Sequence, residues 1–237
     1  MPKIIKPRQL SSYEKQYHYS HPQEQPKTKY GGLIRSLNLE DFWNSLSESE
    51  RRYIKQCYKQ RLGGDGESAS LDSPSRIVEF TTQTASNFLS AYATWAINDK
   101  KYNLAEKMLK ESLKRVENPI DEHFTYNHLI DLYYKQREKG PEYLQKCITC
   151  CLKDIQILSA FKSEWNKKYG DAEKLKIPSL TRLAIIYEKQ GLIQEAINIC
   201  QKALELGFIN DGTKSGFQGR LERLQRKLEK QQEELTQ

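Results

Sequence analysis

The sequence lacks any long hydrophobic run, and hydrophobic residues make up only 37% of its 237 positions. No window approaches the roughly 18 uninterrupted apolar residues that a membrane span needs. The segment Met1–Pro7 also lacks the apolar core of a secretory signal peptide. Scarce apolar side chains must be concentrated on narrow helix stripes rather than on thick buried sheets. We therefore expect a cytoplasmic protein without a membrane partner.

Cysteines are few, and their number, five, is odd, which does not suit a secreted disulfide framework. Cys147-x-x-Cys150-Cys151 has a spacing that zinc sites use. However, Cys147 and Cys151 are one helical turn apart on an apolar stripe, and no second ligand pair follows. His123 and His128, five positions apart on a helix, point roughly 140° away from each other. We therefore expect the cysteines to pack as small core residues, and we expect the protein to bind neither a metal nor a cofactor.

Glycine is absent between Glu67 and Lys139, and no alternating β-branched run bounded by turns occurs. The fold class predicted is therefore all-α. The sequence also has no P-loop, dinucleotide fingerprint, nucleophile elbow or His-Glu-x-x-His motif. We expect a protein that is not an enzyme, and a hydrolase acting through His128 and Asp131 is the enzymatic alternative.

The positive charge is unevenly distributed along the chain. There are 38 Lys and Arg against 31 Asp and Glu, and residues 1–35 contribute five of the seven net positive charges. This proline-rich segment shows no sustained period, which predicts a basic disordered leader. For residues 36–72 we expect a short helical hairpin and a loop. Ser47 and Glu50 have the spacing of a capping box at the start of its second helix.

The remaining chain reads as pairs of amphipathic helices, at residues 73–209, followed by a closing helix at 210–237. Pro74, Pro119, Pro141 and Pro178 each precede an apolar-periodic run, where a first-turn proline loses no hydrogen bond. The residues expected to pack the pairs together are Tyr92, Ala93, Ala105, Leu129, Tyr133, Cys147, Leu183, Ala184, Tyr187, Gly191, Ala196 and Ala203. Small side chains among them allow two antiparallel helices to approach closely.

The clearest pair is the string Leu183-Ala184-x-x-Tyr187-x-x-x-Gly191-x-x-x-x-Ala196, followed by Ala203-Leu204-Glu205-Leu206. This string resembles a tetratricopeptide repeat. The resemblance implies a helix-turn-helix repeat solenoid with an N-terminal helical extension and a C-terminal capping helix. Equivalent small positions are 42 and 49 residues apart, at Ala105, Cys147 and Ala196, against the family's roughly 34. We therefore expect an irregular array.

In tetratricopeptide proteins the first helix of each pair lines a concave groove that holds a peptide or a partner helix, and the resemblance implies the same here. Helical geometry places on that side the residues Asn127, His128, Asp131, Tyr134, Lys135, Arg182, Glu188 and Lys189. We expect Tyr134 to act as an aromatic anchor. Of the side chains with which chaperone-type members hold a terminal carboxylate, Arg182 is matched, whereas Ser90, Thr94, His128 and Pro178 stand at other clamp positions.

The function expected is a non-catalytic protein–protein interaction or regulatory adaptor. The alternative is nucleic-acid binding through the basic leader and the cations in and just before the final helix: Lys214, Arg220, Arg223, Arg226 and Lys227. We expect a monomer, with a dimer formed through the final helix as the alternative, because its apolar seam spans only about one and a half heptads.

Overall fold

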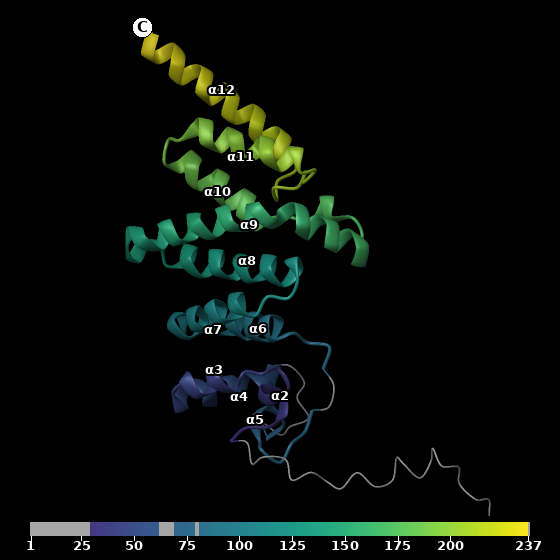
Figure 1. Ribbon diagram of the computed structural model, residues 1–237. Helices are drawn as coiled ribbons and strands as arrows, with labels where there is room; N and C mark the ends of the chain where they lie inside the picture. The colour runs from purple at the N-terminus through teal and green to yellow at the C-terminus, as the bar shows by residue number, and fades with distance from the viewer. Residues whose placement is uncertain (1–28, 62–68, 79–80, 237) are drawn as a thin grey trace, which may run out of the picture.

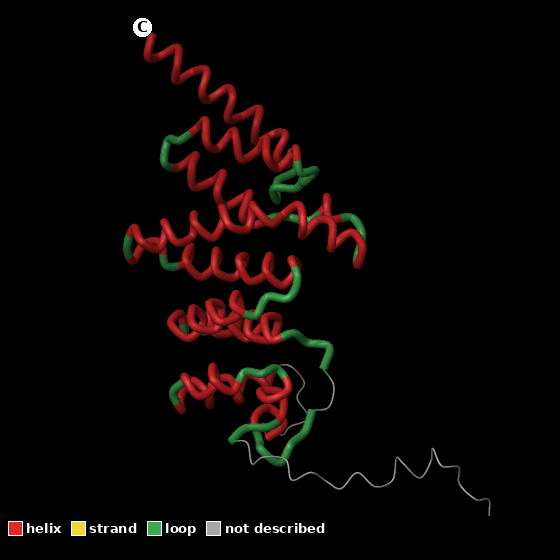
Figure 2. The backbone as a smooth tube through the Cα atoms, in the orientation of Figure 1, coloured by secondary structure: helices red, strands yellow, loops and turns green. Residues whose placement is uncertain are grey.

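The computed structural model describes residues 29–61, 69–78 and 81–236, and within these ranges all regular structure is helical (Figures 1 and 2). The all-α prediction is therefore confirmed. The helices stack in successive layers along the molecule, from the N-terminal group to the C-terminal helix (Figure 1). None of the helices in the described ranges has both the length and the apolar character needed to cross a membrane.

In the described residues, the N-terminal layer consists of α2 (Gly32–Ser36), α3 (Glu40–Ser45), α4 (Glu48–Arg61) and α5 (Ala69–Asp72). Three antiparallel pairs follow it. They are α6 (Ala85–Asn98) with α7 (Tyr102–Lys114), α8 (Pro119–Lys135) with α9 (Pro141–Lys168), and α10 (Pro178–Lys189) with α11 (Ile193–Glu205). Two 3₁₀ turns, η1 (Arg137–Lys139) and η2 (Ala172–Lys174), flank α9, and α12 (Gly216–Thr236) ends the chain.

The helix starts follow local side-chain chemistry. In the predicted capping box, the Ser47 amide donates to Glu50 Oε2 at 2.8 Å and the Glu50 amide donates to Ser47 Oγ at 3.2 Å. Thr84 and Asn118 cap α6 and α8 by accepting from backbone amides three residues later. At Gly191 the backbone has a φ of +78°, which lets the chain turn from α10 into α11.

The small residues predicted to let the helices nest are buried. Ala105, Cys147 and Ala196 are each 0% exposed. Tyr187 is half-buried. Most of the other predicted packing residues are also buried, namely Tyr92, Ala93, Leu129, Tyr133, Leu183, Ala184 and Ala203. These residues therefore lie in the core, whereas Gly191, also predicted to pack the pairs together, is exposed in the turn between α10 and α11.

Helix α9 joins two hydrophobic clusters. Its first half contributes Cys147 and Cys151 to a cluster that extends from α2 to α10. Its second half contributes Leu158 and Phe161 to a cluster formed with α10, α11 and α12. In that second cluster Phe217 of α12 is 0% exposed, so the final helix packs against α11. The 28-residue length of α9 accounts for the wide spacing between the last two pairs.

Several predicted boundaries are wrong. The leader was expected to end at residue 35, but α2 already begins at Gly32, because Leu33 and Ile34 are buried beside α5. Residues 1–28 of the leader, and the loop residues 62–68, lie outside the described residues. The expected hairpin contains α3, α4 and α5, so it is not a simple pair. Pro74 lies in a turn rather than at a helix start, whereas Pro119, Pro141 and Pro178 do begin helices.

Candidate functional site

A cavity of about 500 Å³ lies against the first helices of the last two pairs. It is lined by Asn127, His128, Ile130 and Asp131 of α8, and by Lys176, Pro178, Thr181, Arg182 and Ile185 in and before α10. The structure therefore brings together four of the eight predicted groove residues, from two helices separated in sequence by the whole of α9. Lys176 and Thr181 were not predicted. Their position depends on how the connection after α9 leads into α10, which no local pattern encodes.

His128 is fixed against α6 by two hydroxyl groups. Its Nδ1 lies 2.7 Å from Ser90 Oγ, and its Nε2 lies 3.3 Å from Thr94 Oγ1. Ser90 is only 4% exposed, so this contact belongs to the interface between α6 and α8. Burial lowers the pKa of His128, against the opposing effect of Asp131. The imidazole is consequently held in its neutral form at neutral pH.

We expect this histidine to make the fold less stable in weak acid. Because the folded protein holds His128 with a lowered pKa, the unfolded chain binds a proton more readily as the pH falls below about 6.5. The free energy of unfolding should therefore decrease as the pH falls through that value. Urea unfolding at about pH 7.5 and about pH 5.5 measures the difference, and His128→Gln should reduce it. A His128→Gln variant that keeps the full wild-type pH dependence contradicts this assignment.

Arg182 is held in place by an aromatic ring. Its guanidinium carbon lies 3.7 Å from the centroid of the Tyr134 ring, and that of Arg137 lies 4.3 Å from the same centroid. Such contacts restrict the side chain of Arg182, a residue that also lines the cavity. The half-buried ring of Tyr134, predicted to act as an aromatic anchor, is thus already in contact with two arginine side chains and is not among the residues that line the cavity.

The other predicted groove residues lie at the rim or face a different helix. Lys135 pairs with Asp131 at 2.8 Å. Glu188 instead faces α12, where Arg223 Nη2 donates to its carboxylate at 2.8 Å. This hydrogen bond is the main reason that the pKa of Glu188 is lowered. Lys189 is exposed at the end of α10 and does not line the cavity. The prediction that both residues line the groove is therefore wrong: Glu188 is engaged by α12, and Lys189 lies at the exposed end of α10.

The three cysteines of α9 and His123 of α8 are buried inside the fold. Cys147, Cys150 and Cys151 are all buried on α9, and burial raises the pKa of Cys150 to about 12. His123 Nδ1 lies 2.8 Å from Asp154 Oδ1, on the opposite side of α8 from the contacts of His128. Within the described ranges, no three His, Cys, Asp or Glu side chains are grouped so that they could hold a metal ion.

The cations considered for nucleic-acid binding are partly engaged within the fold. Arg220 Nε donates to the buried Asp211 carboxylate at 2.8 Å, and Arg223 is bound to Glu188. Lys214, Arg226 and Lys227 are exposed, but Lys227 Nζ also lies 3.9 Å from Glu188 Oε1. Three of the five cations therefore form ion pairs that link α12 to α10 and the preceding loop.

Comparison with known proteins identifies one distant relative. The chain is 24% identical to an uncharacterized protein of Aquifex aeolicus (strain VF5) over 181 residues, which span 72% of this chain and 82% of that protein. No family model matches the chain, and no solved structure matches it. Because the relative is itself uncharacterized, the likeness carries no activity, substrate or partner to this chain.

Proposed function

We propose that this protein is a helical repeat module of tetratricopeptide type that acts as a non-catalytic interaction or regulatory adaptor. A segment of a partner protein binds in the cavity between α8 and α10. The observation that carries the proposal is this cavity itself, because it lies on the first helices of consecutive pairs and combines charged and apolar side chains. The buried small residues of the pairs and the resemblance of residues 183–206 to a single repeat support the same architecture.

The cavity offers complementary contacts for an extended or helical segment. Ile185 supplies apolar surface, and Arg182 and Lys176 supply positive charge beside it. Arg182 is already held on the Tyr134 ring, so little side-chain entropy is lost when it binds a carboxylate. Asp131 and its partner Lys135 form a polar rim. We infer that the partner segment places an apolar side chain against Ile185 and an acidic one against Arg182.

A paired substitution in the cavity tests this function. Arg182→Glu with Ile185→Ser reverses the cavity's charge and removes apolar surface. We expect partners bound by the immobilised wild-type chain from a native cell extract to be retained at least about tenfold less well, because truncated central contacts dominate binding energy. Mass spectrometry of the retained proteins measures the effect, and titration with the purified partner then verifies direct binding.

The matched control makes the same chemical changes on another surface. Lys202→Glu with Leu192→Ser also reverses one exposed cation and removes one exposed apolar side chain, both outside the cavity. This variant should retain partners as the wild-type chain does. If every specific partner is held equally by the cavity variant, and thermal unfolding shows both variants to be folded, the proposed binding site is wrong.

A further inference from the structure

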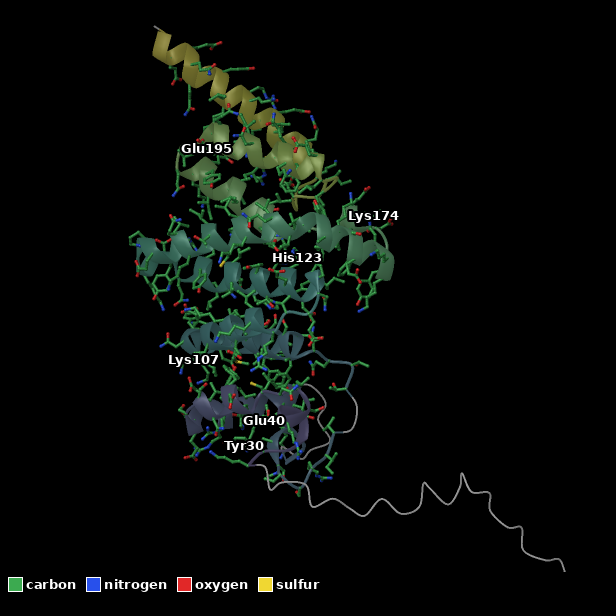
Figure 3. All side chains as sticks on the ribbon, viewed as in Figure 1. Tyr30, Glu40, Lys107, His123, Lys174 and Glu195 are labelled. Atoms are coloured by element: carbon green, nitrogen blue, oxygen red, sulfur yellow. The ribbon has the colours of Figure 1, made fainter. Side chains whose placement is uncertain are left out.

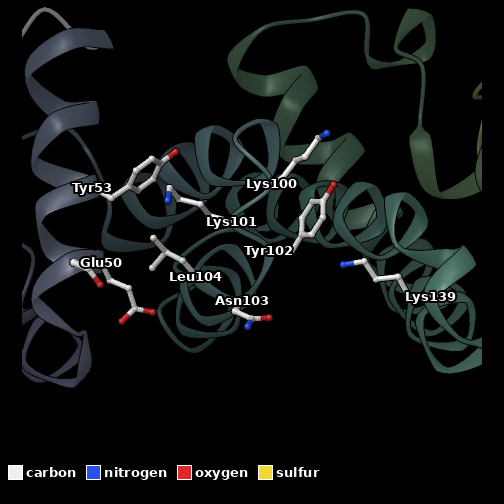
Figure 4. Close-up of a pocket in the computed structure, with 9 residues that line it drawn as sticks. Glu50, Tyr53, Lys100, Lys101, Tyr102, Asn103, Leu104 and Lys139 are labelled. Carbon is white, nitrogen blue, oxygen red and sulfur yellow. The ribbon is translucent and has the colours of Figure 1, made fainter.

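A second cavity, of about 390 Å³, lies between the N-terminal layer and the first helix pair (Figure 4). Ser49, Glu50 and Tyr53 of α4 form one wall. The other wall is formed by the turn between α6 and α7, the start of α7, and η1: Lys100, Lys101, Tyr102, Asn103, Leu104 and Lys139. This cavity shares no residue with the groove on α8 and α10. It therefore requires a separate account.

Two of its three lysines are held on tyrosine rings. Lys101 Nζ lies 5.0 Å from the centroid of the Tyr53 ring, and Lys139 Nζ lies 4.7 Å from that of Tyr102. Tyr53 is fixed in turn, since its hydroxyl donates to Asp99 at 2.8 Å. Figure 4 shows Lys101 reaching from the start of α7 toward Tyr53 of α4, and Lys139 reaching toward Tyr102. Cation–π contacts position the ammonium groups without neutralising them.

The positive charge of this cavity is not balanced by the carboxylates of its lining, and the neighbouring Asp99, outside the lining, accepts from Tyr53. Among the residues that the structure places, Lys100, Lys101 and Lys139 form no ion pair, and Lys139 donates only to Gln136 Oε1 at 3.2 Å. The acid in the lining, Glu50, is already engaged by Lys107 at 2.8 Å and by the Ser47 amide at 2.8 Å. The cavity thus carries an excess of three positive charges over its unengaged acids.

The surrounding surface does not extend this charge into a longer basic track. Lys107 is bound to Glu50, and both Lys110 and Lys146 are bound to Glu106. A nucleic acid needs a row of cations along its backbone, whereas here the unpaired cations are confined to one cavity. Its volume lies within the range of about 300–1,000 Å³ that is usual for small-molecule sites.

We propose that this cavity binds a small molecule that carries a diphosphate or triphosphate group. Three ammonium groups from two chain segments match an anion with several charges spread over adjacent phosphates. The start of α7 adds to the attraction, because its first turn has no acidic residue and its N-cap, Lys101, provides no side-chain acceptor for the free amides. The chemical group that the cavity recognises is the oligophosphate, which is either a free inorganic anion or part of a nucleotide.

Isothermal titration calorimetry of the full chain at low ionic strength tests the proposal, with inorganic triphosphate and ATP as separate probes. The variant Lys100→Ala/Lys101→Ala/Lys139→Ala should bind both probes at least about tenfold more weakly than the wild-type chain. Equal affinity for the two probes identifies the phosphates alone as the recognised group. Tighter binding of ATP identifies a nucleotide whose remaining part contacts the cavity walls.

A charge-matched control separates a built site from general attraction. Lys153→Ala/Lys214→Ala/Lys230→Ala removes three exposed cations far from this lining and should leave both affinities nearly unchanged. Equal weakening by the two triple variants, or no binding of either probe to the wild-type chain, overturns the proposal. So does a single-stranded RNA oligonucleotide that binds more tightly than both probes and loses this binding in the cavity variant, because the occupant is then a nucleic acid.

Discussion

Replacing Asp154 by alanine is expected to lower the free energy of unfolding by about 2–3 kcal/mol, because it leaves the buried His123 without its hydrogen-bond partner. Asp154 lies on α9 and is 0% exposed. Its Oδ1 is 2.8 Å from Nδ1 of His123 on α8. Figure 3 shows His123 between these two helices, in the middle of the stack. The pair therefore ties α8 to α9 where no water is available to replace a lost partner.

The surroundings of His123 explain why the loss cannot be relieved locally. One face of its ring stacks on Phe161, with the centroids 3.9 Å apart. Its Nε2 lies 2.9 Å from Asn127 Nδ2. With both the ring plane and the second nitrogen fixed, the imidazole cannot turn toward solvent when the carboxylate is removed. The unpaired Nδ1 is then buried, and burial of an unsatisfied polar group is costly.

Two comparison variants separate this effect from the loss of any carboxylate. Asp154→Asn keeps an oxygen that accepts from Nδ1 and is expected to destabilise by about 1 kcal/mol. Glu205→Ala removes the exposed helical partner of Lys202 and should leave the urea midpoint nearly unchanged. If Asp154→Ala unfolds at the same urea concentration as Glu205→Ala, the buried pair does not stabilise the protein. A double-mutant cycle with His123→Phe then measures the coupling directly.

The sequence predicted the elements whose cause is local. Apolar periodicity, the capping box at Ser47 and Glu50, and first-turn prolines predicted most helices and the buried small residues. The exception at Pro74 shows the limit of that reasoning. A proline permits a helix start, but α6 begins only where Thr84 supplies a capping hydroxyl.

The candidate site was predicted only in part, because its other features depend on contacts distant in sequence. Helical geometry correctly placed Asn127, His128, Asp131 and Arg182 on one side. It could not show that α12 binds Glu188, since the two partners are 35 residues apart and joined by a loop. It also could not show that Arg182, from the next pair, covers Tyr134. Periodicity specifies the face of a helix, and only the packed fold specifies what covers that face.

The second large effect is expected in the N-terminal layer, where Trp43→Ala should lower the free energy of unfolding by about 3–5 kcal/mol. Trp43 of α3 is 1% exposed and is among the largest fully buried side chains. Its Nε1 donates to Asp72 Oδ2 of α5 at 3.0 Å, and Lys55 of α4 pairs with the same oxygen at 2.8 Å. One indole thus fills the space between three short helices and orients the carboxylate that joins them.

The loss should extend beyond the N-terminal layer. The buried cluster that contains Trp43 continues without a break into α6 and α8, and Arg115 of the first pair donates to the Asn38 carbonyl at 2.6 Å. In stacked helical units, stability is shared between neighbouring layers. We therefore expect circular dichroism in urea to show one cooperative transition at a lower midpoint, rather than separate melting of α2–α5.

A conservative variant and the shape of the transition decide between these outcomes. Trp43→Phe keeps most of the apolar volume but removes the hydrogen bond to Asp72, so about 1–2 kcal/mol should be lost. Two separate transitions in Trp43→Ala would show that the N-terminal layer folds independently of the helix pairs. The oligophosphate cavity would then have one wall, α4, that can detach from the other, and ligand binding would have to stabilise the N-terminal layer selectively.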